Sequence, residues 1–182
     1  MKIRRFTTAE SGSAVMTRVD EDVVDTSIPE VTDVANIWGF DAIPNLPLQA
    51  KKILGDYRDL GLFGPPHSVR VDVMIFPPEK GEVPADLSET VGKLNLGTGG
   101  GMTPGEQGAG MHRTDTIDLL MVLEGETNVA YPGEDGQEFE ITVKAGDFLT
   151  HNGTFHRWHN RSDRTCTVLA VVIGTYRDAV ES

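Results

Sequence analysis

The chain has 182 residues, of which 28 are acidic and 16 basic, and its formal net charge is −12. This length suits a single domain with a sizeable core, and the acidic balance argues against a nucleic-acid partner or an anionic membrane surface. Cys166 is the only cysteine, so no internal disulfide or cluster of thiolate metal ligands can form. We expect Cys166 to be a buried strand residue.

Residues 1–66 are predicted to form an N-terminal arm with little regular structure. Their basic start, MKIRRFTTAESGS, is not followed by an apolar run, so no secretory signal is expected and a cytoplasmic location is predicted. One short helix is expected at Leu48–Leu54. Trp38, Phe40 and Phe63 are the expected anchors of the arm on another surface, although Trp38 could instead line a pocket.

Residues 67–182 have the pattern of short strands separated by turns. The run HSVRVDVMIFPPE alternates apolar and polar side chains and stops at a double proline, which is typical of a strand. The glycine-rich GKLNLGTGGGMTPGEQGAG is predicted to be a loop; its glycine run does not end in the Lys-Ser/Thr pair of a phosphate loop and no helix pattern follows it. Four further strand-like stretches are DLLMVLEGETNVAY, QEFEITVKAGD, DFLTHNGTFHRWHN and TCTVLAVVIGTY. This spacing predicts an all-β sandwich or barrel. The longest apolar run, VLAVVIG, is too short to cross a membrane as a helix.

The stretch GMHRTDTIDLLMVLEGE places polar residues on what should be an interior face. Side chains on a strand alternate between its two faces, so one face of an extended stretch carries His112, Thr114, Thr116, Asp118, Leu120 and Val122. The apolar Leu120 and Val122 mark this face as interior. His112 and Asp118 should therefore point inward, where they need a hydrogen-bond partner or a metal ion.

A second group of histidines lies in AGDFLTHNGTFHRWHN, which contains His151, His156 and His159. If this stretch is extended, His156 and Trp158 lie on one face and His159 on the other, so His159 is expected to face outward. Gly153 can reset the register, however, so alternation alone does not choose among the three histidines. His151 should lie near the pocket mouth, where it could transfer protons or have a structural role. His67 is expected to be a surface residue.

These two stretches resemble the two motifs of the cupin superfamily. The first cupin motif has the form G-x5-H-x-H-x3–4-E-x6-G, and it is matched here by His112, Thr114, Asp118 and Gly125. The second has the form G-x5-P-x-G-x2-H-x3-N, and it is matched by Gly146, Asp147, Gly153, His156 and Asn160. His151 stands at the proline position, one residue early. The form HRTDTID looks like that of a subgroup of single-domain cupins.

The resemblance implies a cupin double-stranded β-helix, which is a jelly-roll barrel, with a metal site inside. Its metal ligands would be His112, Asp118 and His156, with Thr114 at the fourth position, where water would take the place of a ligand. Such a set suits Fe(II), and also Mn(II), Ni(II) or Zn(II), and leaves open positions as catalytic sites do. Thr114, Trp158 and Met121 are the predicted pocket residues, with Phe148 as a further candidate; simple core packing would explain Trp158, Met121 and Phe148 equally well.

The expected function is a metal-dependent enzyme acting on a small organic molecule, by lyase, dehydratase, isomerase or dioxygenase chemistry. His151 is the candidate for proton transfer, and Glu106 and Asp115 are either outer acids and bases or surface residues. The alternative is a non-catalytic, metal-free cupin that binds a small molecule. The resemblance also implies a homodimer, in which the arm could cover the partner's sheet edge; an arm folded back on its own barrel would serve equally well.

Overall fold

The fold is all-β in the computed structural model, which describes residues 3–11, 14–22, 26–28, 32–46, 60–79, 101–105, 110–134 and 136–178. Within these ranges thirteen strands form and no residue is helical. No helix that could span a membrane occurs in the same ranges. The helix expected at Leu48–Leu54 lies outside the described residues.

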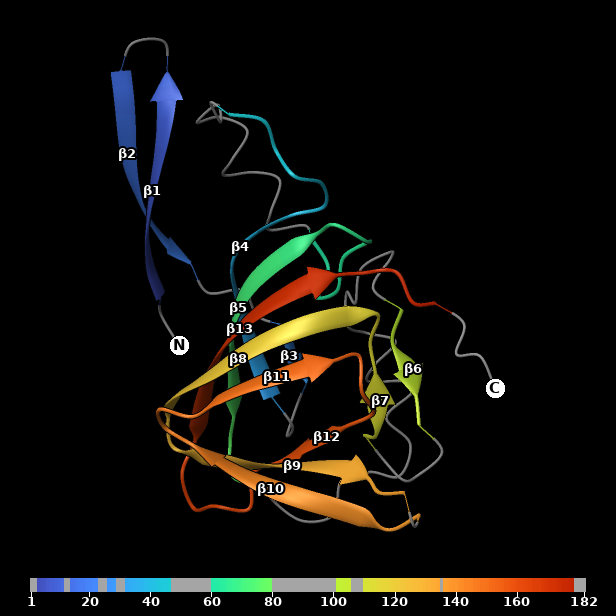
Figure 1. The fold of residues 1–182 in the computed structure, drawn as a ribbon. Helices are drawn as coiled ribbons and strands as arrows, with labels where there is room; N and C mark the ends of the chain where they lie inside the picture. Colours follow the sequence, from blue (N-terminus) through green and yellow to red (C-terminus); the bar gives the residue numbers. More distant parts are fainter. Residues whose placement is uncertain are drawn as a thin grey trace.

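Two antiparallel sheets face each other and form a jelly-roll barrel (Figure 1), as predicted. The larger sheet has the strand order β11 (Phe148–Asn152), β8 (Thr116–Glu124), β13 (Cys166–Gly174), β5 (Val69–Phe76), β4 (Thr32–Phe40) and β3 (Thr26–Ile28). The smaller sheet has the order β10 (Glu138–Lys144), β9 (Glu126–Pro132) and β12 (Arg157–His159). A short hairpin of β6 (Thr103–Pro104) and β7 (His112–Arg113) lies at one end of the barrel.

Apolar side chains fill the space between the two sheets. Burial alternates strictly along β13, so that Cys166, Val168, Ala170 and Val172 face inward. They pack with Val129 of β9 and with other side chains from both sheets, among them Val143, Leu120, Val122, Phe76 and Phe63. Burying a side chain of the valine or leucine kind contributes about 1.5–3 kcal/mol. The predicted burial of Cys166 is confirmed.

Two tight connections carry the chain from one sheet to the other. Gly125, between β8 and β9, has a φ of +74°, a conformation that costs glycine little because it has no Cβ. A Cβ there would lie 2.4 Å from the carbonyl oxygen of Thr165. The return from β10 to β11 is tied to this corner, because the amide of Ala145 donates to the carbonyl of Gly125.

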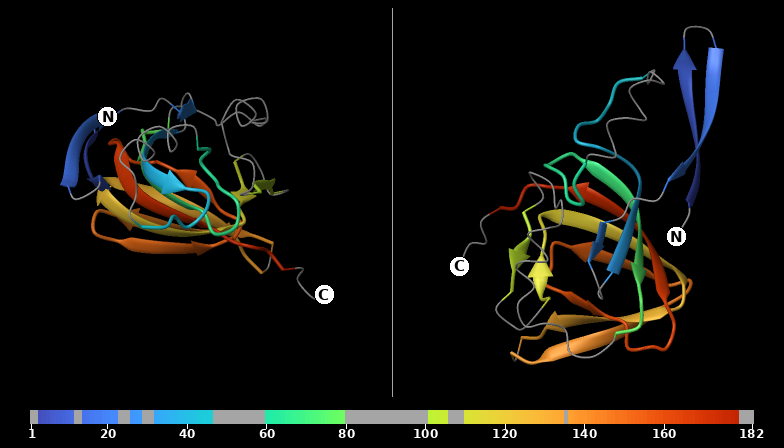
Figure 2. Two further views of the ribbon diagram at one scale, coloured as in Figure 1. Left: turned by 90° about the horizontal axis from the view of Figure 1, so that it is seen from above. Right: turned by 180° about the vertical axis from the view of Figure 1, so that it is seen from behind.

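Residues 1–66 contain more regular structure than the sequence predicts. A hairpin of β1 (Ile3–Ser11) and β2 (Ala14–Asp22) stands beside the barrel (Figure 2), and β4 pairs with β5 as part of the larger sheet. The register of β4 shifts between Asn36 and Trp38, which hides the alternation that marks a strand. Pairing with β5 supplies the stability that local propensity does not. The division at residues 66 and 67 stays a prediction.

Two charged side chains of β5 are fully buried. Arg70 donates hydrogen bonds to the carbonyls of Gly61 and Phe40 and to the carboxylate of Asp41. Asp72 lies on the interior face opposite Ala170 of β13, and neither of its carboxyl oxygens has a hydrogen-bond partner among the described residues. Burial raises the pKa of Asp72 to about 7, although the Arg70 charge acts in the opposite direction.

Candidate functional site

Three histidines meet at the end of the barrel near β7. His112 and His156 form an isolated bridge in which each backbone amide donates to the other's carbonyl, at 3.0 and 2.9 Å. Their ring centroids lie 4.7 Å apart. His151, from β11 of the larger sheet, brings its ring centroid to 4.1 Å from that of His156. The structure therefore places His151 inside the cluster rather than at its margin.

The backbone fixes which nitrogen of two of these rings carries the proton. Nδ1 of His112 lies 2.8 Å from the carbonyl oxygen of Gly110, and Nδ1 of His156 lies 2.9 Å from that of Thr154. A carbonyl only accepts, so each Nδ1 is the donor and each neutral ring keeps a lone pair on Nε2. This pattern of one anchored and one free nitrogen is typical of metal-binding histidines.

Burial keeps the imidazoles in their neutral form. It lowers the pKa of His112, although the hydrogen bond to Gly110 acts in the opposite direction. It also brings the pKa of His156 well below 6.5, and the charges of His112 and His151 add to this effect. The pKa of His151 falls to about 4, mainly through burial and also through His112. At neutral pH all three rings are therefore unprotonated bases and potential ligands.

Tyr131 of β9 contacts the cluster through His151. Its hydroxyl lies 2.8 Å from Nε2 of His151, and burial raises the pKa of Tyr131 to about 12, so it remains a neutral phenol. Nδ1 of His151 is buried and has no partner among the described residues. The sequence predictions did not include Tyr131, yet its parity in β9 is that of the buried Thr127 and Val129, which would have placed it inside.

Asp118 lies directly across the strand pair from His151. The two residues are partners in the β8–β11 register, so their side chains project from the same face. Oδ1 of Asp118 is buried without a hydrogen-bond partner among the described residues. Burial raises the pKa of Asp118 to about 6, and the Thr116 hydroxyl acts in the opposite direction. Thr116 also bonds the hydroxyl of Thr114 at 2.6 Å, so Thr114 is already engaged.

The donors fit a metal ion in part. Within the described ranges, Nε2 of His112, Nε2 of His156 and Oδ1 of Asp118 make no hydrogen bond. However, among the described residues no group of three or more His, Cys, Asp or Glu side chains is arranged to hold an ion. The predicted set of His112, Asp118 and His156 is therefore not preassembled as a chelating group. Of the predicted ligands, His112 and His156 are the two that lie side by side.

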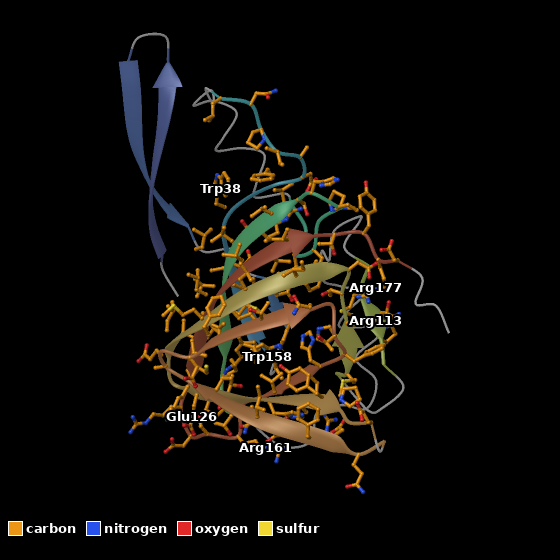
Figure 3. All side chains as sticks on the ribbon, in the orientation of Figure 1. Trp38, Arg113, Glu126, Trp158, Arg161 and Arg177 are labelled. Carbon is orange, nitrogen blue, oxygen red and sulfur yellow. The ribbon has the colours of Figure 1, made fainter. Side chains whose placement is uncertain are left out.

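Of the predicted pocket residues, Trp158 points into the barrel, whereas Met121 and Phe148 point outward. Trp158 lies inside, with its ring centroid 5.7 Å from that of His151 and stacked on Phe76 at 4.8 Å (Figure 3). The prediction that Met121 lines the pocket is wrong, because its parity in β8 is opposite to that of Leu120 and it is 42% exposed. Phe148 lies across from Met121 on the same outer face and is 63% exposed.

The remaining candidates lie away from the imidazoles or outside the described residues. His159 projects from the face of β12 opposite to Trp158 and is mostly buried, with Nδ1 3.3 Å from a carboxylate oxygen of Glu79. The exposure predicted for His67 is confirmed. Asp115 pairs with Arg177. Glu106 lies outside the described residues.

Comparison with known proteins relates the barrel to cupins. Residues 101–172 match the family model described as a cupin domain, which supports the predicted resemblance at the level of the superfamily. Two proteins of Diaporthe leptostromiformis, phomopsin biosynthesis cluster proteins C' and D, are each 44% identical over 52 residues. That segment is 29% of this chain and 25% of each relative, so the chain covers about a quarter of the relatives' length.

Several solved structures share a distant likeness. An oxalate oxidase is 16% identical, with a TM-score of 0.43 over 84% of this chain and 56% of that one. A DMSP lyase from Ruegeria pomeroyi is 18% identical, with a TM-score of 0.37 over 62% and 42%. The cupin domain of a transcriptional regulator from Enterobacter cloacae is 15% identical, with a TM-score of 0.33 over 60% and 83%. We draw no functional conclusion from likenesses this distant.

Proposed function

We propose, from the match of residues 101–172 to the cupin domain, that this barrel is a metal-dependent enzyme acting on a small organic molecule. His112 and His156 would hold one divalent transition-metal ion through Nε2, with Asp118 as the third ligand. The sequence predicts Fe, Mn, Ni or Zn as the ion, and two imidazoles with one carboxylate suit any of them.

The observation that carries this proposal is the state of the two bridged imidazoles. Both are neutral, and both have Nδ1 committed to a backbone carbonyl. Their Nε2 lone pairs are therefore available, on rings held 4.7 Å apart. Oδ1 of Asp118, which has no hydrogen-bond partner among the described residues, lies on the buried face of β8 and would be the third donor. A buried carboxyl oxygen without a partner is costly, and coordination would remove that cost.

When bound, the ion would polarise a carbonyl or enolate oxygen, or activate water or dioxygen. The chain's own residues would handle the protons. His151 is an unprotonated base: with its Nε2–H donating to the Tyr131 hydroxyl at 2.8 Å, Nδ1 would keep the lone pair that takes a proton from the substrate and later returns it. Trp158 forms an apolar wall beside the rings of His151 and His156 and would limit the access of water. Lyase, dehydratase, isomerase and dioxygenase chemistry all remain within this proposal.

A metal-free binding pocket is the second candidate, and one observation favours it. No group of three donors is preassembled among the described residues. In this case the open nitrogens of the three histidines and the carboxyl of Asp118 would bond a small molecule directly. By name, the two relatives from Diaporthe leptostromiformis belong to a biosynthesis cluster, which supports a small metabolite as the ligand in either case.

Metal content and cobalt titration test the choice between these two functions. We expect the purified protein to hold one transition-metal ion per chain, and the metal-free form to bind Co(II). The variant His156→Ala should bind Co(II) at least ~100-fold more weakly, a loss of about 2.7 kcal/mol. His67→Ala is the matched control, since His67 is exposed. If the wild-type chain binds no Co(II), or if both variants bind it equally, the metal proposal fails.

A homodimer in the cytoplasm is also proposed. Support for the dimer comes from the outer face of the larger sheet, where Met121, Leu123 and Phe148 are exposed. Apolar residues gathered on one face favour association. Light scattering on the purified protein would give twice the chain mass if the proposal holds, and Phe148→Asp should then yield monomers.

A further inference from the structure

We infer that Arg177 is a positioning residue that holds the two histidine-bearing connections together; this inference rests on the proposed function. Nη2 of Arg177 donates to the carbonyl of Thr114 at 2.8 Å and to that of Gly153 at 3.0 Å. Its Nε donates to the carboxylate of Asp115. One guanidinium therefore joins two chain segments that are nearly forty residues apart in the sequence.

These two segments are the ones that set the positions of the imidazoles. Thr114 and Asp115 lie between β7, which carries His112, and β8, which carries Asp118. Gly153 follows β11, which carries His151, and stands three residues before His156. Holding the carbonyls of Thr114 and Gly153 on one cation keeps the connections adjacent, and with them the bridge between His112 and His156.

The segment that carries Arg177 is itself anchored. The amide and the hydroxyl of Thr175 both donate to the carbonyl of Asp115, at 2.9 and 3.2 Å. The amide of Gly174 donates to the carbonyl of Ser68, and the carbonyl of Gly174 accepts from the amide of His67. The guanidinium is therefore presented from a fixed backbone.

The side chain of Arg177 matters for its geometry more than for its charge. Arg177 and Asp115 are 29% and 30% exposed, and ion pairs of such exposure contribute little to stability. The forked guanidinium, in contrast, donates to three acceptors at once, which a lysine cannot do with the same planar geometry. Gly153 has a φ of +61°, and a Cβ there would lie 2.5 Å from Nη2 of Arg177. A side chain at position 153 would displace the guanidinium.

Two variants disrupt the contacts of Arg177, one by changing Arg177 itself and the other by changing Gly153, and each has a matched control. Arg177→Gln removes the guanidinium, and Arg161→Gln removes one that pairs with Glu140 of β10, away from Arg177 (Figure 3). Gly153→Ala displaces the guanidinium. Gly146→Ala imposes a similar backbone strain, at a φ of +94°, with no atom within 4 Å of the added Cβ.

The first measurement is hydrogen exchange of the metal-free protein. The amides of His112 and His156 donate to each other's carbonyls, so their exchange reports the bridge directly. We expect them to exchange at least ~10-fold faster in Arg177→Gln and in Gly153→Ala, relative to their controls, because local opening becomes easier. If the amides of His112 and His156 exchange at the same rate in all four variants, the inference about Arg177 is overturned.

The second measurement is Co(II) binding. We expect Arg177→Gln and Gly153→Ala to bind Co(II) roughly 10–100-fold more weakly, as happens when groups that orient metal ligands are removed. The visible bands of the bound Co(II) should also shift, which a general loss of stability would not cause. Arg177→Lys should recover part of the affinity. A wild-type chain that binds no Co(II), with exchange still accelerated in Arg177→Gln, would refute the metal proposal and leave the role of Arg177 standing.

Discussion

Asp72→Asn is expected to stabilise the protein above neutral pH. Asp72 is fully buried with no partner for either carboxyl oxygen among the described residues, and its pKa is raised to about 7. The ordinary pKa is 3.8. Between these values the unfolded chain has released this proton while the folded chain still binds it. The folded state therefore binds more protons, and this group makes the stability fall as the pH rises from about 4 to about 7.

The size of the effect follows from the two pKa values. Each pH unit between 3.8 and 7 corresponds to about 1.4 kcal/mol, so the ionised group costs about 4 kcal/mol above pH 7. Asparagine has the same shape and no charge. Asn36 of β4 is the register partner of position 72, and its Oδ1, which has no partner among the described residues, is a candidate acceptor for the new amide. We expect a gain of about 2–4 kcal/mol at pH 8 and almost none near pH 4.

Urea unfolding at pH 4.5 and pH 8 measures this gain. Tryptophan fluorescence follows it, because Trp158 stacks on Phe76 in the core. The other carboxylates are shared by both proteins, so the difference between their pH profiles isolates Asp72. Asp163→Asn is the control, since the side chain of Asp163 is 93% exposed. Parallel profiles for the wild type and Asp72→Asn would show that Asp72 does not retain its proton in the folded state.

Three further changes test the fold and the contact between Tyr131 and His151, each by urea unfolding at neutral pH. Gly125→Ala should lower the free energy of unfolding by about 2 kcal/mol more than Gly146→Ala does. Both glycines have a positive φ, but only the Cβ added at position 125 would meet a carbonyl oxygen, at 2.4 Å. Equal losses in the two variants would contradict the crowding at Gly125. Asn160→Ala should lose about 3 kcal/mol, because its buried amide makes four hydrogen bonds, and a loss below 1 kcal/mol would contradict this. Tyr131→Phe should lose about 1–2 kcal/mol by leaving Nε2 of His151 without its hydroxyl; no loss would mean that this contact does not form.

The interior face of β8 could be predicted because its alternation is regular. Leu120 and Val122 mark one parity as buried, and Thr116 and Asp118 follow the same parity in the structure. The all-β class followed from similar runs in the neighbouring strands. Met121 shows the limit of naming pocket residues by size, since the same alternation that places Asp118 inside turns Met121 outward.

The parts that could not be predicted depend on contacts between distant segments. Gly153 interrupts the strand pattern after β11, so alternation alone does not choose among His151, His156 and His159; the structure brings the first two together. Strand β4 forms because β5 offers it an edge, a condition that no local pattern records. The contacts of Arg177 with Thr114 and Gly153 likewise arise only when β13 brings the end of the chain back to the site.

The imidazoles of His151 and His156 are supplied by opposite walls of the barrel, His151 by β11 and His156 from beside β12. The apolar layer between the walls, which contains Val129 and Val168, holds the two sheets together. Neither sheet carries both rings, so the rings meet only while the sheets stay packed on each other. Binding of a small molecule that needs both rings should therefore be lost on heating at the temperature at which near-ultraviolet circular dichroism records the loss of core packing.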